Sequence, residues 1–272
     1  MDGYIMRLRI LTWNISFGHG PGSDGLNGEY HPRPESHYDA AIERMAGVLR
    51  EEQIDIAFLQ EVDFDARRSH HRNQLELLSR KSGLLHRSAL ITWNCPWVPY
   101  PGLDPRTQFG SIRSGGGILS RFPIRPLQSD LLPKPRENGR IYNFFYLHRF
   151  LQMVEIEGLR LCNLHLEAFS KDNRSLHLVR LADRLRDFDL DLAGGDLNGE
   201  APAPEALPAD LNRGWEAPLL PGPTFPAGNA SLFIDRFIVK KGRFRDVVLR
   251  VPDTGTVSDH LPVLFEGSFE RA

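Results

Sequence analysis

The chain has few cysteines and no long hydrophobic segment. Only Cys95 and Cys162 occur among 272 residues. A disulfide framework and a cysteine-rich zinc site are therefore excluded, and we expect a reducing, cytoplasmic environment. No stretch approaches the ~20 apolar residues that cross a membrane. Residues 1–7 include an acidic residue and lack the apolar run of a secretory signal, so we expect neither a signal peptide nor a transmembrane segment.

The chain also lacks an excess of charge of either sign. Its 33 basic and 35 acidic residues give a net charge of -2, which excludes a binder that holds nucleic acid by electrostatics alone. The densest basic run, residues 67–72, is either a solvated segment or a contact for a substrate phosphate. Trp93, Trp97 and Tyr100 either stack on a base, cover a lipid or pack beneath their own loop.

Two common catalytic motifs are absent as well. No Gly-x-Ser-x-Gly nucleophile elbow occurs, and residues 114–117 lack the lysine and the spacing of a phosphate-binding P-loop. The adjacent residues Ser258, Asp259 and His260 cannot form a hydrolase triad with one another, because neighbouring side chains of an extended segment point to opposite faces.

The composition does support a large folded core. Apolar residues make up 41% of the chain and charged residues 25%, as in ordinary globular domains. No internal repeat or low-complexity tract divides the chain, and we interpret the proline-rich stretch 201–226 as a surface loop. We therefore expect a single domain over residues 1–272, acting as a monomer.

Hydrophobic periodicity predicts a chain dominated by strands. Helices are expected around 41–49, with Ser36 or Asp39 as the cap, and over 73–82 and 173–188. Residues 93–114 are expected to form a loop. The predicted strands are 7–14, 54–60, 84–92, 116–120, 141–147, 150–156, 159–166, 191–195, 231–239, 243–251 and 261–265.

Acids, amides and histidines stand at or near the ends of several predicted strands. Strand ends of one sheet lie together in space, so residues remote in sequence can converge there. Carboxylate and amide oxygens are hard ligands that suit Mg²⁺ or Mn²⁺ and leave room for a phosphate. Each residue also has a structural interpretation, as a turn former, an exposed strand end or a buried histidine. The set is Asn14, Glu61, His165, Asp196, Asn198, Asp235, Asp259 and His260.

Seven short blocks occur in an order that resembles the endonuclease/exonuclease/phosphatase superfamily. They extend from Asn14 to Val263, nearly the whole chain, and seven blocks in order are far more specific than one. The blocks are Thr-Trp-Asn-Ile, Leu-Gln-Glu-Val, Gly-Gly-Ile-Leu-Ser-Arg-Phe-Pro-Ile, Asn-Leu-His-Leu-Glu, Gly-Gly-Asp-Leu-Asn, Ile-Asp-Arg-Phe and Ser-Asp-His-Leu-Pro-Val.

The resemblance implies an α/β fold of the DNase-I-like type. Its four layers are two mixed β-sheets packed face to face, with helices outside. It also implies Mg²⁺- or Mn²⁺-dependent hydrolysis of a phosphate ester. By the same resemblance, Glu61 is the principal metal ligand, with Asn14 beside it and Asp259 as a further ligand. Ser16 stands where the apurinic endonucleases carry an Asp, so that ligand is missing here.

The remaining residues take catalytic roles by the same comparison. Asp196 and Asn198 would orient the attacking water and the scissile phosphate. His260 would contact the phosphate or act as general acid or base, with Asp235 orienting it, and His165 would be a second histidine on the phosphate. Water would attack in line, without a covalent intermediate. We expect neighbouring acids to raise the pKa of Asp196, so that it can take a proton from water.

Three functions stay open at this point. The first is a phosphodiesterase of the nuclease type, either an endo- or exonuclease or a DNA end-processing enzyme. The second is a phospholipase-C-like, sphingomyelinase or phosphatase activity on a lipid or sugar phosphate. The third is a catalytically inactive member that serves as a binding module.

Overall fold

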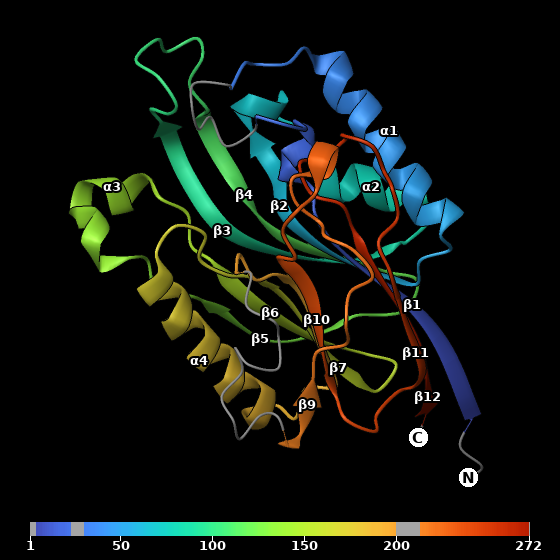
Figure 1. Ribbon diagram of the computed structural model, residues 1–272. Helices are drawn as coiled ribbons and strands as arrows, with labels where there is room; N and C mark the ends of the chain where they lie inside the picture. The colour runs from blue at the N-terminus through green and yellow to red at the C-terminus, as the bar shows by residue number, and fades with distance from the viewer. Residues whose placement is uncertain (1–3, 23–29, 200–212, 272) are drawn as a thin grey trace.

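Two six-stranded mixed sheets form the body of the molecule. The computed structural model describes residues 4–22, 30–199 and 213–271 (Figure 1). The strand orders are β11-β12-β1-β2-β4-β3 and β5-β6-β7-β8-β10-β9. The strands are β1 (Tyr4–Asn14), β2 (Ile56–Ala66), β3 (His86–Val98), β4 (Gly110–Ser120), β5 (Arg125–Leu131), β6 (Phe150–Ile156), β7 (Leu159–His165), β8 (Leu192–Asp196), β9 (Trp215–Glu216), β10 (Asp235–Lys240), β11 (Arg245–Arg250) and β12 (Val263–Arg271).

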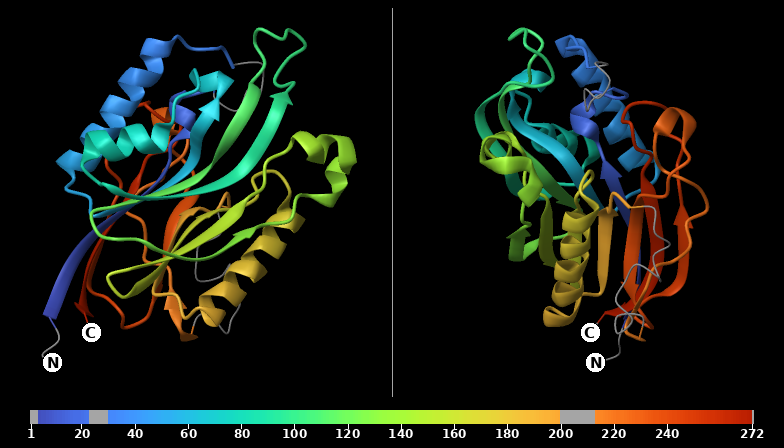
Figure 2. Two further views of the ribbon diagram at one scale, coloured as in Figure 1. Left: turned by 180° about the vertical axis from the view of Figure 1, so that it is seen from behind. Right: turned by 60° about the vertical axis from the view of Figure 1, so that its left-hand side comes forward.

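Helices cover the outer face of each sheet. The helices α1 (Glu35–Glu51) and α2 (Gln74–Ser82) pack against the first sheet, and α4 (Lys171–Asp187) packs against the second. In Figures 1 and 2, α1 and α2 lie on one side of the sandwich and α4 on the other. The predicted four-layer α/β sandwich is confirmed. None of the helices in the described part of the chain has the length and apolar character needed to cross a bilayer.

Large apolar side chains fill the space between the two sheets. Phe58 from β2, Phe237 from β10 and Phe265 from β12 are fully buried in this central core. Cys162 is buried as well, as predicted. A hydrogen bond joins the two sheets inside the sandwich: the side-chain amide of Gln60 in β2 donates to Asn163 Oδ1 in β7 at 2.7 Å. This hydrogen bond fixes the register of one sheet against the other, directly below the cavity described in the next subsection.

Each sheet contains one parallel pair of strands at its centre. In the first sheet β1 pairs with β2, and Asn14 lies opposite Gln60. In the second sheet β7 pairs with β8, and His165 lies opposite Asp196. Because parallel strands end at the same edge, both pairs deliver their last residues to one end of the sandwich.

The segment 141–147 is a helix, and the predicted strand there is wrong. Residues Gly139–Phe145 form the short helix α3. The neighbouring strand β6 is already paired with β5 on one side and with β7 on the other. The segment therefore cannot pair with β6, and it does not add to the free edge of β5 or of β3 either; as a helix it satisfies its backbone groups internally.

The boundaries of other elements also differ from the prediction. The predicted loop 93–114 is confined to residues 99–109, because β3 and β4 pair as far as Val98 and Gly110. Pro34 is the N-cap of α1 and no side chain caps the helix, so a cap by Ser36 or Asp39 is wrong. The first part of the predicted loop 201–226 lies outside the described residues. Its later part contains β9, which pairs with β10 and was not predicted.

Candidate active site

A cavity of about 740 Å³ lies at the end of the sandwich where both parallel pairs terminate. Seven of the eight residues predicted from the sequence line it, and Asp235 lies directly behind one of them. The structure thus brings the predicted set together from six different segments of the chain. The lining members are Asn14, Glu61, His165, Asp196, Asn198, Asp259 and His260.

Asp196 is the centre of the polar cluster. Its Oδ2 lies 3.1 Å from Asn14 Nδ2 and 3.3 Å from His165 Nε2. Its Oδ1 accepts the backbone N–H of Asn198 at 2.8 Å. The carboxylate therefore joins residues of both sheets, and because it is buried it needs these hydrogen bonds to offset the cost of its desolvation.

The glycines before Asp196 allow this close approach. A Cβ at Gly194 would lie 2.4 Å from the Phe237 ring, and a Cβ at Gly195 would lie 1.9 Å from the backbone oxygen of Leu164. Any side chain at either position would push β8 away from its neighbours. The Gly-Gly-Asp sequence thus places the Asp196 carboxylate deep at the strand end.

The ionisation of Asp196 differs from the prediction. Burial by itself raises the pKa of this carboxyl. The hydrogen bond from His165 and the charges of His260 and His165 outweigh burial and hold the pKa well below its ordinary value. The expectation of a raised pKa is therefore wrong, because histidines and not acids are the nearest ionisable neighbours. Asp196 is ionised across the physiological range.

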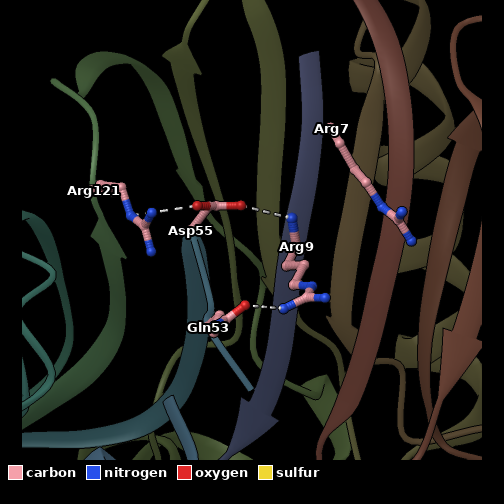
Figure 3. A pocket seen from close by; sticks show the side chains of 5 residues that line it. All are labelled: Arg7, Arg9, Gln53, Asp55 and Arg121. Carbon is pink, nitrogen blue, oxygen red and sulfur yellow. Dashed lines mark hydrogen bonds and ion pairs between the residues drawn. The ribbon is translucent and has the colours of Figure 1, made fainter. Parts of the chain in front are cut away.

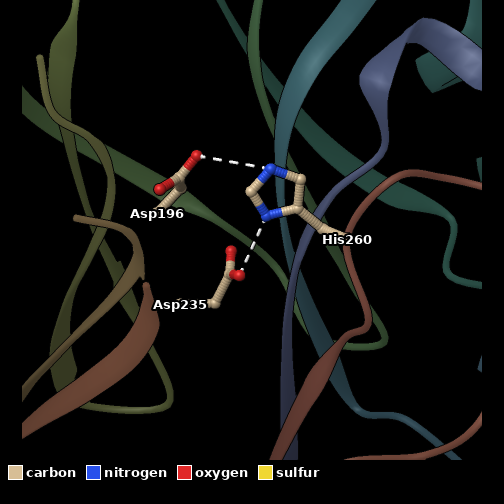
Figure 4. A group of neighbouring side chains, drawn as sticks. All are labelled: Asp196, Asp235 and His260. Carbon is tan, nitrogen blue, oxygen red and sulfur yellow. Dashed lines mark hydrogen bonds and ion pairs between the residues drawn. The ribbon is translucent and has the colours of Figure 1, made fainter. Parts of the chain in front are cut away.

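Asp235 and His260 form a buried dyad (Figure 4). His260 Nδ1 lies 2.9 Å from Asp235 Oδ2, and Nε2 faces Asp196 Oδ2 at 3.9 Å. Burial lowers the pKa of His260, but the nearby carboxylates, Asp235 above all, raise it to about 10. The alternative partner, Arg236, donates instead to the Phe233 carbonyl. His260 is thus a protonated imidazole whose Nε2–H points toward the cavity cluster.

A β-bulge presents Glu61 to the cavity. The predicted strand ended at this residue, but β2 continues to Ala66, and its pairing with β4 shifts register between Leu59 and Val62. Glu61 has φ +55°, a left-handed conformation that is uncommon outside glycine and often marks functional positions. Its side chain is 28% exposed, more open to the cavity than the other acids of the cluster with a described exposure.

Asn14 orients the acids through its amide nitrogen. Nδ2 lies 3.3 Å from Glu61 Oε1 and 3.1 Å from Asp196 Oδ2, and Oδ1 accepts the backbone N–H of Ser16 at 3.0 Å. The Ser16 N–H needs an acceptor, so the amide cannot be flipped without losing this bond. Asn14 therefore holds Glu61 toward Asp196, whereas the predicted ligation through its oxygen remains a prediction.

The acids of the cavity suit a hard cation. Glu61, Asp196 and Asp259 supply carboxylate oxygens on the cavity wall, the donor type that Mg²⁺ and Mn²⁺ prefer. A tighter group of possible ligands, Asp196, Asp235 and His260, has atoms within 4.8 Å of one another. In that group, however, His260 Nδ1 and Asp235 already bond each other, so we interpret those two residues as a dyad behind the site.

Arg149 is a cavity residue that sequence reasoning missed. It is buried just before β6, and its Nη1 contacts both ring nitrogens of His165, Nδ1 at 3.2 Å. Its positive charge faces Glu61, Glu167 and Asp196. No sequence motif predicts this role for Arg149. The pairing of Phe150 with His165 places Arg149 beside the cluster.

The arginines of the basic run 67–72 mostly contact other residues of the chain. Arg68 forms two hydrogen bonds with Asp63 and lies 3.6 Å over the Phe17 ring. Arg67 lies over Trp97, and Arg72 pairs with Glu35 and Asp39. Of these cations only Arg68 reaches the cavity wall. Trp93 and Tyr100 line the cavity, whereas Trp97 does not.

A second, shallow hollow lies beside the N-terminal half of β1 (Figure 3). Its cations face acids and amides of the fold: Arg9 donates to Gln53 at 2.7 Å, and Arg121 pairs with Asp55 at 3.4 Å. Arg7 pairs with Glu266 at 2.8 Å. With these charges compensated, we assign no chemistry to this hollow. Its lining residues are Arg7, Arg9, Gln53, Asp55 and Arg121.

The fold and the cluster define a DNase-I-like protein with a polar centre at the mouth of its sandwich. A sequence profile described as the Endonuclease/Exonuclease/phosphatase family matches residues 11–260. The chain therefore belongs to this family, whose members are generally phosphoester hydrolases. A search of curated proteins finds no match.

Solved structures share the fold at low sequence identity. An endonuclease/exonuclease/phosphatase from Beutenbergia cavernae has a TM-score of 0.66 and 21% identity, covering 97% of this chain and 72% of its own. A family protein from Bacteroides vulgatus has a TM-score of 0.62 and 14% identity, covering 97% and 100%. Truncated Caenorhabditis elegans TDP2 has a TM-score of 0.58 and 19% identity, covering 96% and 97%. At these identities the likeness supports the common fold.

Proposed function

We propose that the protein is a metal-dependent phosphodiester hydrolase whose centre is the Asp196 cluster. The observation that carries this proposal is the convergence of Asp196, His165, His260 and Glu61 on one open cavity. The cluster contains ionised carboxylates, a protonated imidazole and a buried guanidinium within reach of one another. A cavity that combines fixed cations with cation-binding oxygens suits a phosphate held beside a metal ion.

The residues present fit Mg²⁺ or Mn²⁺. We propose that Glu61 and Asp259 hold the ion, with Asn14 beside them and Asp196 adjoining, because these oxygens line the cavity without filling it. When bound, the ion would neutralise negative charge on the phosphate and lower the pKa of a coordinated water. The side chains of the chain itself then have to orient the phosphate and the water.

The catalytic steps follow from the charges of the cluster. Asp196, ionised at neutral pH, accepts a hydrogen bond from the attacking water and directs it at phosphorus. His260 Nε2–H and Arg149 donate to non-bridging oxygens, where charge develops in the transition state. The water oxygen bonds to phosphorus, the bond from phosphorus to one alcohol oxygen breaks, and the alcohol leaves with a proton. In-line attack by water needs no covalent enzyme intermediate.

Two substrate classes remain candidates. A nucleic-acid phosphodiester is the first, supported by the family resemblance. A lipid or other amphiphilic phosphodiester is the second, and a specific observation favours it: the cavity wall beyond the polar cluster is built from Phe17, Trp93, Tyr100, Phe109 and Phe145. An inactive binding module is disfavoured, because every polar residue of the predicted set is present and placed at the cavity.

The test is turnover with and without metal. We expect hydrolysis of bis(p-nitrophenyl) phosphate in Mg²⁺ or Mn²⁺ and none in EDTA, with plasmid, single-stranded DNA, sphingomyelin and phosphoinositides screened in parallel. Asp196→Asn should retain metal binding and lose about 10³-fold in turnover, and Glu61→Ala should weaken metal binding as well. Asp183→Asn, an exposed acid on α4, is the matched control. Undiminished turnover in EDTA, or in both cavity variants, contradicts the proposal.

A further inference from the structure

The short helix α3 exposes most of its apolar residues. Its apolar residues Ile141 and Phe144 are 81% and 66% exposed, whereas the polar residue Asn143 is half-buried and bonded on several sides. The Asn143 side-chain amide donates to the Pro135 carbonyl at 2.7 Å, and the backbone carbonyl of Asn143 accepts from Lys134 Nζ at 2.6 Å. A helix at the surface of a soluble protein normally turns its apolar face inward. Here Asn143 and Phe145 face the body of the molecule, and Ile141 and Phe144 are left exposed.

The helix is held in this orientation by its surroundings. Its last residue is tied to β3, because Trp93 Nε1 donates to the Phe145 carbonyl at 2.8 Å. Glu137, just before α3, accepts a hydrogen bond from Ser170, the N-cap of α4. Figures 1 and 2 show α3 projecting beyond the sheets, next to the beginning of α4. The exposed apolar residues are therefore a fixed feature of the surface.

The exposed surface of α3 is continuous with the active-site cavity. Tyr142 and Phe145 line the cavity from α3, and Phe169, itself 64% exposed, lines it from the loop before α4. The same cavity therefore holds aromatic residues of α3 and the Asp196 cluster, so a ligand resting on α3 can extend to that cluster. Contiguous exposed apolar residues of this kind commonly mark sites of interaction.

Cations outnumber acids on the same surface. Arg136, Arg140 and Lys171 are exposed and form no ion pair with any residue the structure describes, whereas Glu137 and Asp172 are the exposed acids next to them in sequence. Exposed apolar side chains beside an excess of cations match the interfacial layer of an anionic membrane, where the apolar groups enter the acyl region and the cations meet headgroups. Aliphatic Ile141 has no ring to stack on a nucleobase, which favours lipid over nucleic acid.

We propose that α3 and Phe169 dock the protein onto an anionic lipid surface, from which an amphiphilic phosphodiester enters the cavity. The acyl or other apolar part lies along the aromatic wall and the phosphodiester lies at the Asp196 cluster. This inference names a substrate class for the hydrolase proposed above and rests on that function for the chemical step, whereas the docking itself does not.

Vesicle co-sedimentation tests the docking. The wild-type protein should bind phosphatidylcholine vesicles that contain phosphatidylserine and bind pure phosphatidylcholine more weakly. Ile141→Ser with Phe144→Ser should lower vesicle binding at least ~10-fold, and Arg136→Gln with Arg140→Gln should remove the preference for phosphatidylserine. Leu85→Ser and Arg87→Gln are matched controls: Leu85 is 68% exposed and lies just before β3, and Arg87 is exposed near the start of β3, at the opposite end from Val98, which lines the cavity. These controls should bind as the wild type does.

Other occupants of the surface are separate outcomes of the same experiment. Absence of wild-type vesicle binding, or equal binding by the Ile141/Phe144 variant, overturns the proposal. Two further results overturn it. In the first, neither the wild type nor the Ile141/Phe144 variant binds vesicles, and the wild type binds a single-stranded oligonucleotide that the variant does not bind. In the second, light scattering shows that the wild type is a dimer and the variant is a monomer. Thermal melting of each variant excludes loss of folding as the cause.

Turnover separates this inference from the proposed function. If the wild type hydrolyses bis(p-nitrophenyl) phosphate with Mg²⁺ but does not bind vesicles, the proposed function stands and the docking proposal is refuted. If the wild type binds vesicles but hydrolyses none of the substrates, the docking proposal stands and the proposed function is refuted. Release of soluble headgroup from vesicles doped with sphingomyelin or phosphatidylinositol should fall in the Ile141/Phe144 variant in parallel with binding; release that is unchanged overturns the proposed delivery of substrate.

Discussion

Two buried arginines on opposite walls of the cavity have different partners. On the wall formed by β2 and the following turn, Arg68 forms two hydrogen bonds with Asp63, at 3.0 and 2.8 Å, and stacks on Phe17. On the wall formed by β6 and β7, Arg149 contacts His165, and its Nε has no hydrogen-bond partner among the described residues. Within the described part of the chain, Arg149 forms no ion pair with a carboxylate, although it faces three of them.

The difference separates a structural cation from one available for chemistry. The charge of Arg68 is fully compensated by a carboxylate that is itself completely buried. Breaking such a pair leaves a charge without a partner in a medium of low dielectric constant. The guanidinium of Arg149 retains hydrogen-bonding capacity and faces the carboxylates Glu61 and Asp196. A phosphate between these groups would compensate Arg149 directly.

Replacing Arg68 should have the largest effect of the variants below, and the effect should be on stability. Arg68→Met leaves the Asp63 carboxylate buried with Ser69 Oγ as its remaining side-chain partner. We expect a loss of about 3–5 kcal/mol in the free energy of unfolding, measured by urea denaturation. Asp63→Asn combined with Arg68→Met should recover part of that loss. A single variant as stable as the wild type would show that the pair is not structural.

Replacing Arg149 should affect turnover more than stability. Arg149→Met removes a cation that has no hydrogen-bonded carboxylate but whose charge offsets that of the buried Glu167, so we expect a loss in the free energy of unfolding that is smaller than for Arg68→Met. Turnover of bis(p-nitrophenyl) phosphate should fall about 10²-fold, because a transition-state donor is lost. If the two arginine variants show the same ratio of lost stability to lost turnover, the comparison between the two walls is wrong.

Asp235→Asn should change the titration of His260. In the wild type the pKa of His260 is raised to about 10, against the effect of burial, chiefly by Asp235. Without that carboxylate, burial dominates and we expect the pKa to fall by about two units or more. A raised folded-state pKa stabilises the protein fully below the unfolded value of about 6.5 and loses its contribution as pH rises through about 10.

The measurement is an NMR titration of the His260 ring in EDTA, combined with urea unfolding across that pH window. Between pH 6.5 and 10 the wild type should lose more stability than Asp235→Asn does. An unchanged His260 titration in the variant would remove Asp235 from its role as the orienting partner. Asp191→Asn, which breaks a half-buried contact with Arg243 away from the cavity, serves as the control.

The smallest effect is expected at a third arginine–aspartate contact. Asp130 accepts from Arg184 at 2.7 Å and from Arg180 at 2.8 Å. The Arg184 and Asp130 side chains are 11% and 9% exposed, against 4% and 0% for Arg68 and Asp63. If burial sets the strength of these pairs, Asp130→Asn should cost less than Arg68→Met, about 1–2 kcal/mol at neutral pH. Burial raises the pKa of Asp130, but the arginines lower it overall. The contribution is therefore present above pH 3.8 and disappears as pH falls through the lowered pKa.

Urea midpoints of Asp130→Asn and of Asp183→Asn test this ranking. Asp183 forms an exposed pair with Arg186 three residues away, and its replacement should leave the midpoint unchanged. A cost at Asp130 as large as that at Arg68 would show that burial does not decide the strength of these contacts.

Local pattern predicted the regular elements well where side-chain periodicity and strand pairing agree. The segment 150–156 is a strand as predicted, since its alternating apolar residues face two packed layers. The segment 141–147 was misassigned because its aromatic residues favour a strand, whereas in the structure it joins no sheet edge and Gly139–Phe145 form a helix. Information about which edges are free is not local, and no window of sequence contains it.

The candidate site shows the same division. Residues of the right chemical type at strand ends identified Asp196, His260 and six others before any coordinates, because metal and phosphate chemistry restricts the residue types that serve it. Arg149 has no such signal. It reaches the site because β6 and β7 pair antiparallel, which brings Arg149, 16 residues before His165 in sequence, to that histidine. The direction in which the pKa of Asp196 shifts was also out of reach, since it depends on which neighbours are nearest.

The amino-acid sequence by itself determined the composition of the core, the periodicity of most strands and the chemical inventory of the cavity. These properties are local, since each depends on residue type and spacing along the chain. The tertiary structure alone decided that Glu61 turns on a bulge, that Arg68 is neutralised while Arg149 is not, and that α3 leaves apolar residues exposed. Those outcomes depend on distances between remote segments, because electrostatic and hydrogen-bonding energies change steeply over a few ångströms.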